Sequence, residues 1–272
     1  MTSTSEPAKN ALSGPAIHEI WESVYRNPRS ERLYELIFDW IARSGGVSTG
    51  SSWLDIGCGI GQHAMRLRHR GFRVVAADFS PDRVRAASEH IRQQGLAGEV
   101  TVQQEDLVSG LSFSAASFDA ILCWGVLMHI PQIEPAMSEM LRVTRPGGRL
   151  FIYEVNLHGL DAIASHLISF GKRAVGSSQY RQIITGPYGR EYLARMAAGD
   201  LFIRHARISS IVSFFAQHGC NLKNRIGGEF TERYSIGGVL GQLAHTWNEA
   251  WFRAGRSPHF AHGNLLVFEK LN

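Results

Sequence analysis

The sequence is poor in cysteine and has no long apolar run. Its only three cysteines, Cys58, Cys123 and Cys220, are widely spaced and form no Cys-x-x-Cys pair. This odd set indicates neither a disulfide framework nor a structural zinc site. The longest apolar stretch, about residues 121–128, is far shorter than the roughly 20 residues that span a bilayer. Because the polar N-terminus also lacks a signal pattern, we expect a cytoplasmic protein with no membrane partner.

The chain also lacks a strong charge of either sign. Its 28 Lys plus Arg oppose 24 Asp plus Glu, for a formal net charge of +4 over 272 residues. No run of five basic residues occurs, and basic residues do not alternate with aromatic ones, so we expect no nucleic-acid partner. The hydrophobic content of 44% suffices for one compact α/β domain or for a core with a cap.

Glycine, by contrast, is concentrated at one informative place. Residues 53–63 read as a buried strand, a glycine-dense turn and the start of a helix. The glycines at 57, 59 and 61 permit positive φ and close approach of a ligand, while the N–H groups of the helix start face the same crevice. A dinucleotide fold favours G-x-G-x-x-G. Here Gln62 takes the sixth position and Asp55 precedes the first glycine.

The resulting D-x-G-x-G-x-G pattern resembles the first motif of the class I S-adenosylmethionine-dependent methyltransferases. Four further segments match that family in order between residues 51 and 155. They are the run 73–78 ending in Asp78, the run 100–104 followed by Glu105-Asp106-Leu107, the run 117–123 followed by Trp124-Gly125, and the turn Arg145-Pro146-Gly147-Gly148 before a fifth apolar run. Five motifs in order are far more specific than any one alone.

The resemblance implies an α/β fold, a Rossmann-like doubly wound sheet of seven mostly parallel strands with the seventh antiparallel. Residues 157–205 show helical periodicity, no clear strand, and a Gly-Pro break at 186–187. We therefore divide the chain into a disordered tail (1–15), N-terminal helices that cover the cofactor (16–50), a cofactor-binding core (51–156), a helical cap for substrate recognition (157–205), and a last segment (206–272) with a crossover helix, strands six and seven and a helical insertion.

The resemblance also implies S-adenosylmethionine as cofactor and assigns its contacts. We expect Asp78 to accept hydrogen bonds from the ribose hydroxyls, and Asp106 to bind the adenine with Leu107 as its apolar cover. Asp55 either fixes the glycine loop or reaches the cofactor's amino group through water. The other predicted contacts are Trp21, Tyr25, Gly57, Cys58, Gly59, Gln62, His63, Phe79, Ser80, Cys123, Trp124 and Met128.

Methyl transfer from a sulfonium is an in-line displacement, so the protein mainly aligns the reactants and excludes water. Positioning contributes roughly 7 to 11 kcal/mol in favourable intramolecular cases. A base is needed only when the nucleophile arrives protonated. His129, just after the fourth strand, is the first candidate catalytic base, and His158, just after the fifth, is the second. The alternatives are a hydrogen bond within the loop for His129 and a surface position for His158.

The predicted cap is basic and aromatic, with seven basic residues against three acids between positions 156 and 207. Arginine suits bidentate binding of carboxylate or phosphate, which motivates the hypothesis of an anionic acceptor. The alternatives are a solvated helix face and ordinary core packing. The predicted substrate-binding residues are Tyr180, Arg181, Tyr188, Arg190, Arg204 and Trp247.

Several reaction classes are disfavoured. No Asn-Pro-Pro-Tyr or Asp-Pro-Pro-Tyr follows the fourth strand, and no carboxylate cluster for magnesium is visible. We therefore predict a metal-independent enzyme of the ubiquinone- and menaquinone-biosynthesis type that methylates oxygen or nitrogen of a small molecule, with an anionic or glycosylated acceptor as a further hypothesis. The chain is expected to act as a monomer or homodimer. An NAD(P)-dependent oxidoreductase and a noncatalytic cofactor-binding partner protein remain alternatives.

Overall fold

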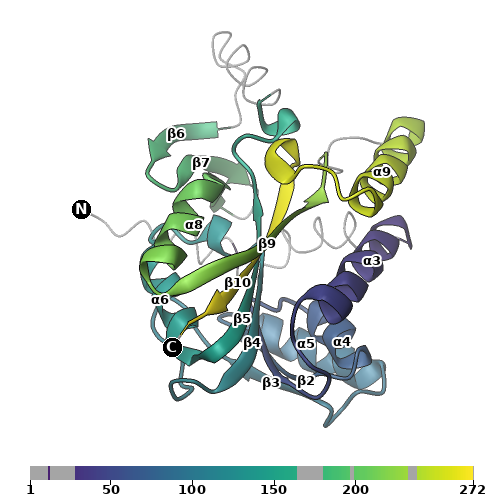
Figure 1. Ribbon diagram of the computed structural model, residues 1–272, viewed down its shortest axis with the longest axis vertical. Helices are drawn as coiled ribbons and strands as arrows, with labels where there is room; N and C mark the ends of the chain where they lie inside the picture. The colour runs from purple at the N-terminus through teal and green to yellow at the C-terminus, as the bar shows by residue number, and fades with distance from the viewer. Residues whose placement is uncertain (1–11, 13–27, 164–179, 197–198, 232–237, 272) are drawn as a thin grey trace.

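A seven-stranded sheet forms the centre of the protein. The computed structural model describes residues 12, 28–163, 180–196, 199–231 and 238–271. Most of the predicted tail 1–15, the helix expected over 16–27, and with it Trp21 and Tyr25, lie outside the described residues. The strand order is β3-β2-β1-β4-β5-β10-β9, with helices on both faces (Figure 1). This arrangement confirms the predicted Rossmann-like fold.

Six strands of this sheet share one direction and the seventh runs against them. The strands are β1 (Ser52–Ile56), β2 (Arg73–Asp78), β3 (Val100–Gln104), β4 (Phe118–Trp124), β5 (Thr144–Val155), β9 (Cys220–Glu229) and β10 (Gly263–Lys270). Strands β3, β2, β1, β4 and β5 pair in parallel. Strand β10 is antiparallel to both of its neighbours, β5 and β9. The prediction of an antiparallel seventh strand is therefore confirmed.

Helices connect the strands and cover the sheet. They are α3 (Pro28–Ser44), α4 (Gln62–His69), α5 (Pro81–Gln93), α6 (Ile133–Val143), α8 (Ile208–Gln217) and α9 (Gly238–Arg253), with short 3-10 helices η1 (Leu127–His129) and η2 (Pro258–Phe260). Helices α3, α4 and α5 pack on one face, and α6 and α8 on the other (Figure 1). Helix α9 lies against α3 and β9.

Three aromatic side chains pack together on the face of the sheet that α3, α4 and α5 cover. The ring of Trp53 on β1 stacks on Phe151 of β5 at 4.8 Å between centroids, and lies 5.0 Å from Phe72. All three side chains are almost completely buried. Burial of each large apolar side chain stabilises the fold by about 2 to 3 kcal/mol. Because both faces of the sheet are covered, its central strands read as continuous apolar runs.

The described part of the predicted cap after residue 179 is a small sheet. Residues 180–206 form three antiparallel strands, β6 (Tyr180–Gly186), β7 (Gly189–Met196) and β8 (Gly199–Ala206). The prediction of a helical cap over 157–205 is wrong for these residues. Burial alternates along β8 at Phe202, Arg204 and Ala206, but one of these buried positions is an arginine, so the sequence does not show the apolar–polar alternation that marks a strand. The predicted Gly-Pro break at 186–187 lies at the β6–β7 hairpin turn.

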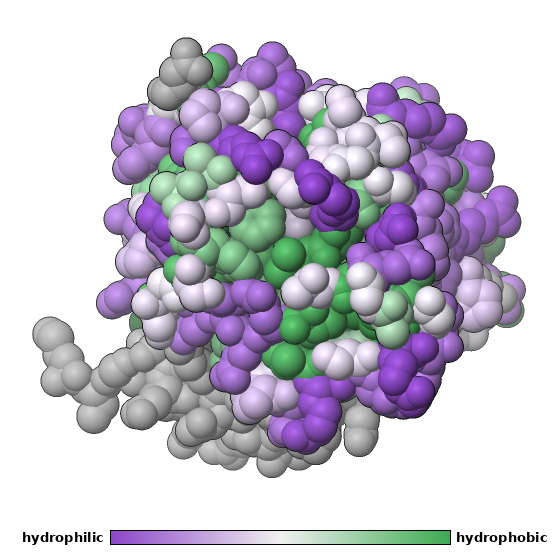
Figure 2. Space-filling view, turned by 90° about the horizontal axis from the view of Figure 1, so that it is seen from below, coloured by the Kyte–Doolittle hydropathy of each residue, from purple (hydrophilic) through white to green (hydrophobic). Residues whose placement is uncertain are grey.

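The cap lies at the carboxyl ends of the parallel strands. The backbone N–H of Leu157, just after β5, donates to Ala206 of β8 at 2.9 Å, and β8 packs on both β5 and η1. Figure 1 shows β6 and β7 at the upper end of the sheet and the C-terminus at its lower end. The lower face shows a central apolar area within a polar surround (Figure 2). Loops after β1, β2, β4 and β5 therefore converge on the cap side, where ligands bind in open α/β sheets.

Candidate functional site

The glycine loop after β1 is built from three left-handed glycines with different neighbours. Gly57, Gly59 and Gly61 have φ of +73°, +57° and +78°. A Cβ on Gly57 would lie 2.4 Å from Val126, and one on Gly61 would lie 2.9 Å from Ile91. A Cβ on Gly59 would have no neighbour within 4 Å. The outer glycines therefore permit close packing, and the middle one borders open space in which a ligand fits.

Asp78 joins the loops after β1 and β2. Its Oδ2 accepts a hydrogen bond from Gly59 N at 3.0 Å, and its Oδ1 accepts one from Ser80 N at 3.0 Å. Burial raises the pKa of this carboxyl, and the amides of Ser80 and Gly59 oppose that shift. Ser80 in turn begins α5, since its Oγ accepts from Arg83 N. The half-buried Phe79 lies between them, and its carbonyl accepts from a glutamine of β3.

Asp55 supplies a buried oxygen that lacks a donor among the described residues. Its Oδ2 has no hydrogen-bond partner there, and the side chain is 1% exposed. Burial raises the pKa of Asp55 to about 7, with the amide of Ala64 lowering it and the charge of Asp78 raising it. A buried carboxylate without a donor is costly. A ligand that carries N–H groups, such as the amino group of S-adenosylmethionine, fits this position.

The acids after β3 are used within their own turn. Asp106 accepts hydrogen bonds from Val108 N at 3.0 Å and from the hydroxyl of Ser109 at 2.7 Å. This is an Asx-type turn. Glu105 is buried and accepts from Ser112, while Leu107 is buried in the apolar core. The adenine contacts expected of Asp106 and Leu107 remain predictions.

His63 lies inside an aromatic cluster between α3, α4 and β4. Its ring stacks on Phe38 at 5.0 Å and lies 4.9 Å from Trp124. Nδ1 accepts a hydrogen bond from the guanidinium of Arg66 at 2.9 Å, because arginine can only donate. Burial, followed by the charge of Arg66, lowers the pKa of His63 well below its usual value. His63 is therefore neutral, and its ring packs on Phe38 and Trp124. The cofactor contact predicted for His63 stays a prediction.

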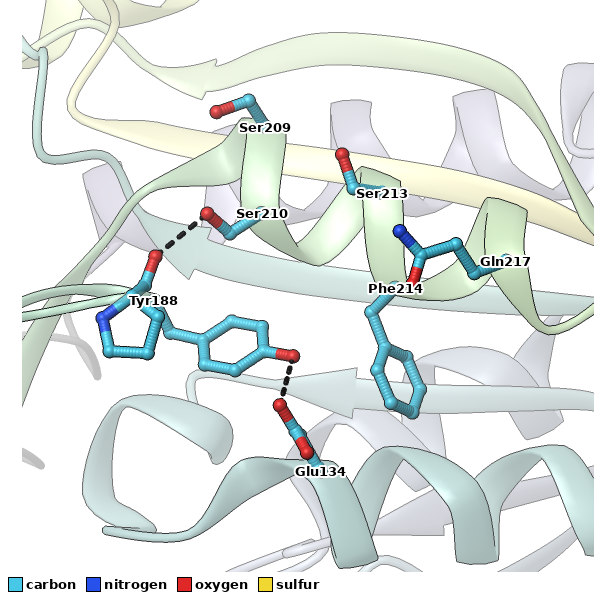
Figure 3. A pocket seen from close by; sticks show the side chains of 8 residues that line it. Glu134, Tyr188, Ser209, Ser210, Ser213, Phe214 and Gln217 are labelled. Atoms are coloured by element: carbon cyan, nitrogen blue, oxygen red, sulfur yellow. Dashed lines mark hydrogen bonds between the residues drawn. The ribbon is translucent and has the colours of Figure 1, made fainter.

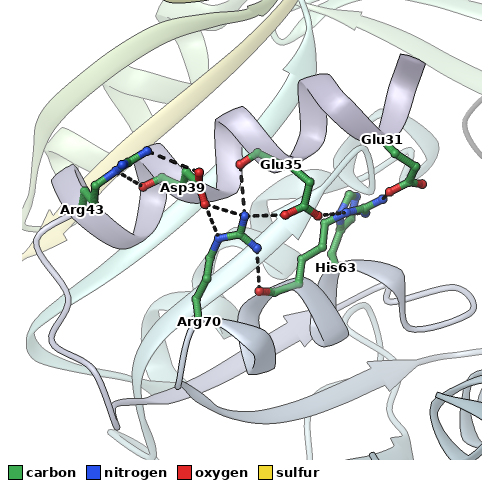
Figure 4. A network of polar contacts seen from close by, with 7 residues as sticks. Glu31, Glu35, Asp39, Arg43, His63 and Arg70 are labelled. Atoms are coloured by element: carbon green, nitrogen blue, oxygen red, sulfur yellow. Dashed lines mark hydrogen bonds and ion pairs between the residues drawn. The ribbon is translucent and has the colours of Figure 1, made fainter. Parts of the chain in front are cut away.

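The same cluster is held by a polar ladder between α3 and α4 (Figure 4). Arg70 donates to Glu35 and Asp39, both at 2.7 Å. Arg66, almost fully buried, pairs with Glu31 and covers an aromatic ring of α3. Networks of this kind fix the orientation of the helix they join. Helix α3 is thus attached beside the glycine loop by both rings and charges.

Trp124 is stacked at the end of β4. Its ring is parallel to that of Tyr153 at 4.1 Å between centroids, with 2° between the planes. The Tyr153 ring fills the space left by Gly228 and Gly263, where a Cβ would lie 2.6 Å and 1.7 Å from its atoms. Trp124 is half-buried, so the predicted cofactor contact through its edge is compatible with this packing.

Two predicted cysteine contacts are enclosed. Cys123 on β4 is fully buried in the apolar core, and burial raises the pKa of its thiol well above the usual value. The cofactor contact predicted for Cys123 stays a prediction. Cys58 lies in the glycine loop, where burial also raises the thiol pKa. Gln62 begins α4 and is half-buried.

The loop after β4 brings His129 under the cap. Nδ1 of His129 lies 2.9 Å from the carbonyl oxygen of Phe202 on β8. Because a carbonyl can only accept, Nδ1 carries a proton, so the neutral form of the ring has its lone pair on Nε2. Met128 beside it is half-buried. The other predicted base, His158, is exposed, and its backbone N–H donates to Asn156 Oδ1 at 3.1 Å.

Two predicted substrate residues instead join parts of the fold. Arg204 is 2% exposed, and its guanidinium donates to three backbone carbonyls of the β4–α6 connection and to Glu191. The hydroxyl of Tyr188 donates to Glu134 of α6 at 2.7 Å. The guanidinium of Arg204 is enclosed and its donors are used inside the protein, whereas Tyr188 is half-buried and only its hydroxyl is used by Glu134. The enclosure of Arg204 argues against a direct contact with substrate, and the substrate-binding role of Tyr188 stays a prediction.

The remaining substrate predictions have mixed positions. Arg190 is half-buried on β7, opposite His205 of β8. Trp247 on α9 is 51% exposed and lies edge-on to Phe230. The side chains of Tyr180 and Arg181 lie outside the described residues. These four assignments stay predictions.

An open pocket of about 240 Å³ lies between α6, α8 and the β6–β7 turn (Figure 3). Tyr188, Glu134 and Phe214 line it, together with serines of α8. Ser210 Oγ donates to the carbonyl of Pro187 at 2.7 Å across its rim. The pocket is bounded by α6 and α8 and not by the glycine loop, so it is separate from the cofactor crevice.

The sequence alone did not reveal an aspartate–histidine pair near the end of β5. Asp161 Oδ2 lies 2.8 Å from Nδ1 of His262, and both side chains are mostly buried. Asn156 connects the two segments, since its amide nitrogen donates to the carbonyls of His259 and Ala261. The pair joins positions 101 residues apart (262 minus 161), so no local sequence pattern indicates it.

Two further absences among the described residues concern metal sites and membrane-spanning helices. Within the described ranges, no group of three His, Cys, Asp or Glu side chains could hold a metal ion. The described helices also include none that is long and apolar enough to cross a membrane. Metal independence itself stays a prediction.

Comparison with known proteins places the core. Residues 54–152 match the model of a family described as a methyltransferase domain. Methyltransferase GfsG from Streptomyces halstedii is 34% identical over 140 residues, which cover 51% of this chain and 49% of that protein. A ubiquinone biosynthesis O-methyltransferase from Xylella fastidiosa (strain 9a5c) is 34% identical over 171 residues, covering 62% and 64%. The matches thus span about half to two thirds of these relatives.

Solved structures share the fold. A SAM-dependent methyltransferase from Methanosarcina mazei superimposes with a TM-score of 0.59 at 19% identity, covering 83% of this chain and 95% of that one. The [4+2]-cyclase SpnF does so with a TM-score of 0.57 at 21% identity, covering 87% and 81%. Fold, glycine loop and sequence matches agree. The core of this chain, residues 54–152, therefore belongs to the methyltransferase domains of the class I S-adenosylmethionine-dependent type, and its cofactor is S-adenosylmethionine.

Proposed function

We propose that this protein transfers a methyl group to an oxygen or nitrogen atom of a small molecule, without a metal ion and with His129 as general base. The observation that carries the proposal is the hydrogen bond from His129 Nδ1 to the Phe202 carbonyl at 2.9 Å. It fixes the tautomer that has a basic Nε2. An imidazole with a reference pKa near 6.5 suits removal of a proton from a hydroxyl or ammonium group.

Different side chains would bind the cofactor, remove the proton and limit access of water. Bound S-adenosylmethionine supplies a methyl group that is activated by the positive sulfur. The glycine loop and Asp78 hold the nucleoside end, and Asp55 offers its buried oxygen to the amino group. His129 accepts the acceptor's proton as the new bond to carbon forms. The β6–β8 cap covers this side of the sheet, which limits access of water.

The relatives favour oxygen as the methylated atom. Two proteins that match the core are named for O-methylation in ubiquinone biosynthesis, in Xylella fastidiosa and Azoarcus. The anionic acceptor now depends on Arg181 and Arg190, because Arg204 is used inside the protein. Arg190→Met should raise the acceptor KM about tenfold if this arginine binds a carboxylate or phosphate. An unchanged KM would remove Arg190 from the acceptor site. A glycosylated acceptor remains a further hypothesis.

The fold alone does not fix the reaction, since one structural neighbour is named a [4+2]-cyclase. The decisive measurement therefore follows the methyl group itself. We would incubate the protein with S-adenosylmethionine labelled in the methyl group and a panel of catechols, phenols and primary amines. Label in an acceptor supports the proposal. Tight binding of S-adenosylhomocysteine in calorimetry with no labelled product from the whole panel would favour a noncatalytic partner protein.

The base is tested separately on any acceptor that the panel identifies. His129→Asn should reduce kcat by about 100-fold or more, because general-base catalysis contributes roughly 10²- to 10⁴-fold. His69→Asn is a matched control, since His69 is exposed in the last turn of α4. A loss under threefold in His129→Asn would leave this histidine structural. A large loss in His158→Asn would instead transfer the role to His158.

A further inference from the structure

The connection between β4 and α6 is held on both sides by side chains far away in the sequence. From below, Glu154 on β5 accepts hydrogen bonds from Leu127 N at 3.0 Å and from Met128 N. Glu154 is 1% exposed. From the cap side, β8 packs on the same connection. Residues 127–131, the β4–α6 connection, therefore lie between the main sheet and the cap sheet.

Arg204 on β8 supplies most of the contacts from the cap. Its Nη1 donates to Leu127 O at 3.1 Å and to Ile130 O at 2.8 Å, and its Nη2 donates to Pro131 O at 2.6 Å. Glu191, opposite Arg204 on β7, accepts from its Nε at 3.1 Å and Nη2 at 2.8 Å. All three guanidinium nitrogens thus have acceptors, as a buried cation requires.

His129 lies inside this set of contacts. Its backbone N–H donates to Val126 O at 3.0 Å, within the turn whose carbonyls Arg204 holds. Its ring donates to Phe202, two residues before Arg204 on the same strand. The position of the His129 ring is therefore set jointly by the turn and by β8. Arg204 is the group that keeps these two backbone segments in fixed register.

We propose that Arg204 is a positioning residue that holds the His129 imidazole in its base-competent tautomer and orientation by attaching the β4–α6 connection to the cap. This proposal rests on the proposed role of His129. In-line methyl transfer depends on geometry, and displacement of a catalytic group by about 1 Å can cost roughly 100-fold. Arginine is required because only its planar fork can reach three carbonyls and a carboxylate at once, whereas lysine offers a single nitrogen.

The first test does not need an acceptor. Nitrogen-15 NMR of histidine-labelled protein distinguishes a protonated Nδ1 from a protonated Nε2, and the His129 signals are assigned by their loss in His129→Asn. We expect one Nδ1–H tautomer in the parent protein and a mixture of tautomers in Arg204→Lys and Arg204→Met. Arg207→Lys is the matched control. This arginine follows β8, is half-buried and touches only one carbonyl, at 3.4 Å.

The second test uses kinetics with an acceptor from the panel of catechols, phenols and amines. Arg204→Met should lower kcat at least tenfold, with KM for S-adenosylmethionine within twofold of the parent. In the His129→Asn background the same substitution should lower kcat by less than twofold, because its effect passes through His129. Glu191→Gln keeps an acceptor oxygen for Arg204 and should lose only about threefold. It serves as the milder variant if Arg204→Met does not fold.

The two tests separate the proposals. A changed tautomer mixture with no turnover of any acceptor would support the positioning role while overturning the proposed reaction. An unchanged Nδ1–H tautomer in folded Arg204→Lys or Arg204→Met would overturn the positioning role. Equal losses of kcat in the parent and His129→Asn backgrounds would also overturn it, since Arg204 would then act on general stability. Calorimetry with S-adenosylhomocysteine confirms in each variant that the cofactor site is intact.

Discussion

The cofactor side and the acceptor side of this protein use their polar groups in different ways. On the cofactor side, Asp55 keeps a buried oxygen without a donor among the described residues, and Gly59 borders open space. On the cap side, the donors of Arg204 and Tyr188 are already satisfied within the protein. Unsatisfied polar atoms and open space indicate where a ligand binds. Satisfied donors show where a side chain supports the fold.

The comparison teaches that residue type alone does not identify a substrate contact. Arg190 and Arg204 are both arginines on adjacent cap strands, yet one is half-buried and the other fully enclosed by carbonyls and Glu191. A buried guanidinium must be fully hydrogen-bonded within the protein, whereas a partly exposed one can still donate hydrogen bonds to a ligand. The four predictions below test whether the two sides differ as described.

The largest expected effect is on cofactor binding. Asp78→Asn retains one oxygen but removes the charge and replaces the second acceptor with a donor. We expect the Kd for S-adenosylhomocysteine to rise at least 100-fold, because hydrogen bonds to a charged group contribute about 1.5 to 3 kcal/mol each. Calorimetry measures this value. Asp82→Asn is the control, since Asp82 is exposed and pairs only with Arg85 on the surface of α5. A rise below fivefold in Asp78→Asn would remove it from the ribose site.

The next effect separates two glycines of one loop. Gly57→Ala places a methyl group 2.4 Å from Val126 in a backbone with φ of +73°. We expect a loss of about 3 kcal/mol in the free energy of unfolding, from overpacking and left-handed strain together. Gly59→Ala has the left-handed strain without the clash, so its free energy of unfolding should fall by only about 1 kcal/mol. Relative to this loss of stability, Gly59→Ala should weaken cofactor binding more than Gly57→Ala does. Urea unfolding and calorimetry on both variants test this; equal stability losses would contradict it.

The sequence predicts the structure of the cofactor side better than that of the cap side. The loop from Gly57 to Gly61 was recognised because left-handed backbone conformations restrict the residue type locally. The cap strands were not recognised, since a buried position of β8 is taken by Arg204 and the residue types therefore do not alternate between apolar and polar. The contacts of Arg204 with residues 127–131 join segments more than 70 residues apart. Such pairings depend on the tertiary fold, so spacing in the sequence could not supply them.

The support of the β4–α6 connection should make stability depend on pH. Burial raises the pKa of Glu154 from 4.5 to about 8, while Arg204 and two backbone amides lower it less strongly. A carboxyl whose folded pKa is raised gives stability that is complete below its unfolded pKa and is lost as pH rises through the folded value. Between pH 5.5 and 8 we expect the parent protein to lose about 3 kcal/mol more than Glu154→Gln does.

Urea unfolding at several pH values measures this slope. Asp55, with its pKa raised to about 7, contributes in the same direction, so Glu154→Gln should reduce the slope without abolishing it. Glu139→Gln is the control, because Arg142 holds the pKa of Glu139 below its usual value. That variant should differ from the parent only in acid. An identical slope in Glu154→Gln and the parent would show that Glu154 is ionised in the folded protein.

The smallest effect tests the cap most directly. Tyr188→Phe removes the hydrogen bond to Glu134, a half-exposed contact worth about 0.5 to 1 kcal/mol. If Tyr188 only joins the β6–β7 turn to α6, Tm should fall by a few degrees and the acceptor KM should not change. Ser210→Ala, which removes the bond to the same turn at Pro187, should behave alike. An acceptor KM raised more than threefold by Tyr188→Phe but not by Ser210→Ala would mean that this tyrosine contacts the acceptor. Satisfied donors would then no longer separate the supporting side of the molecule from its binding side.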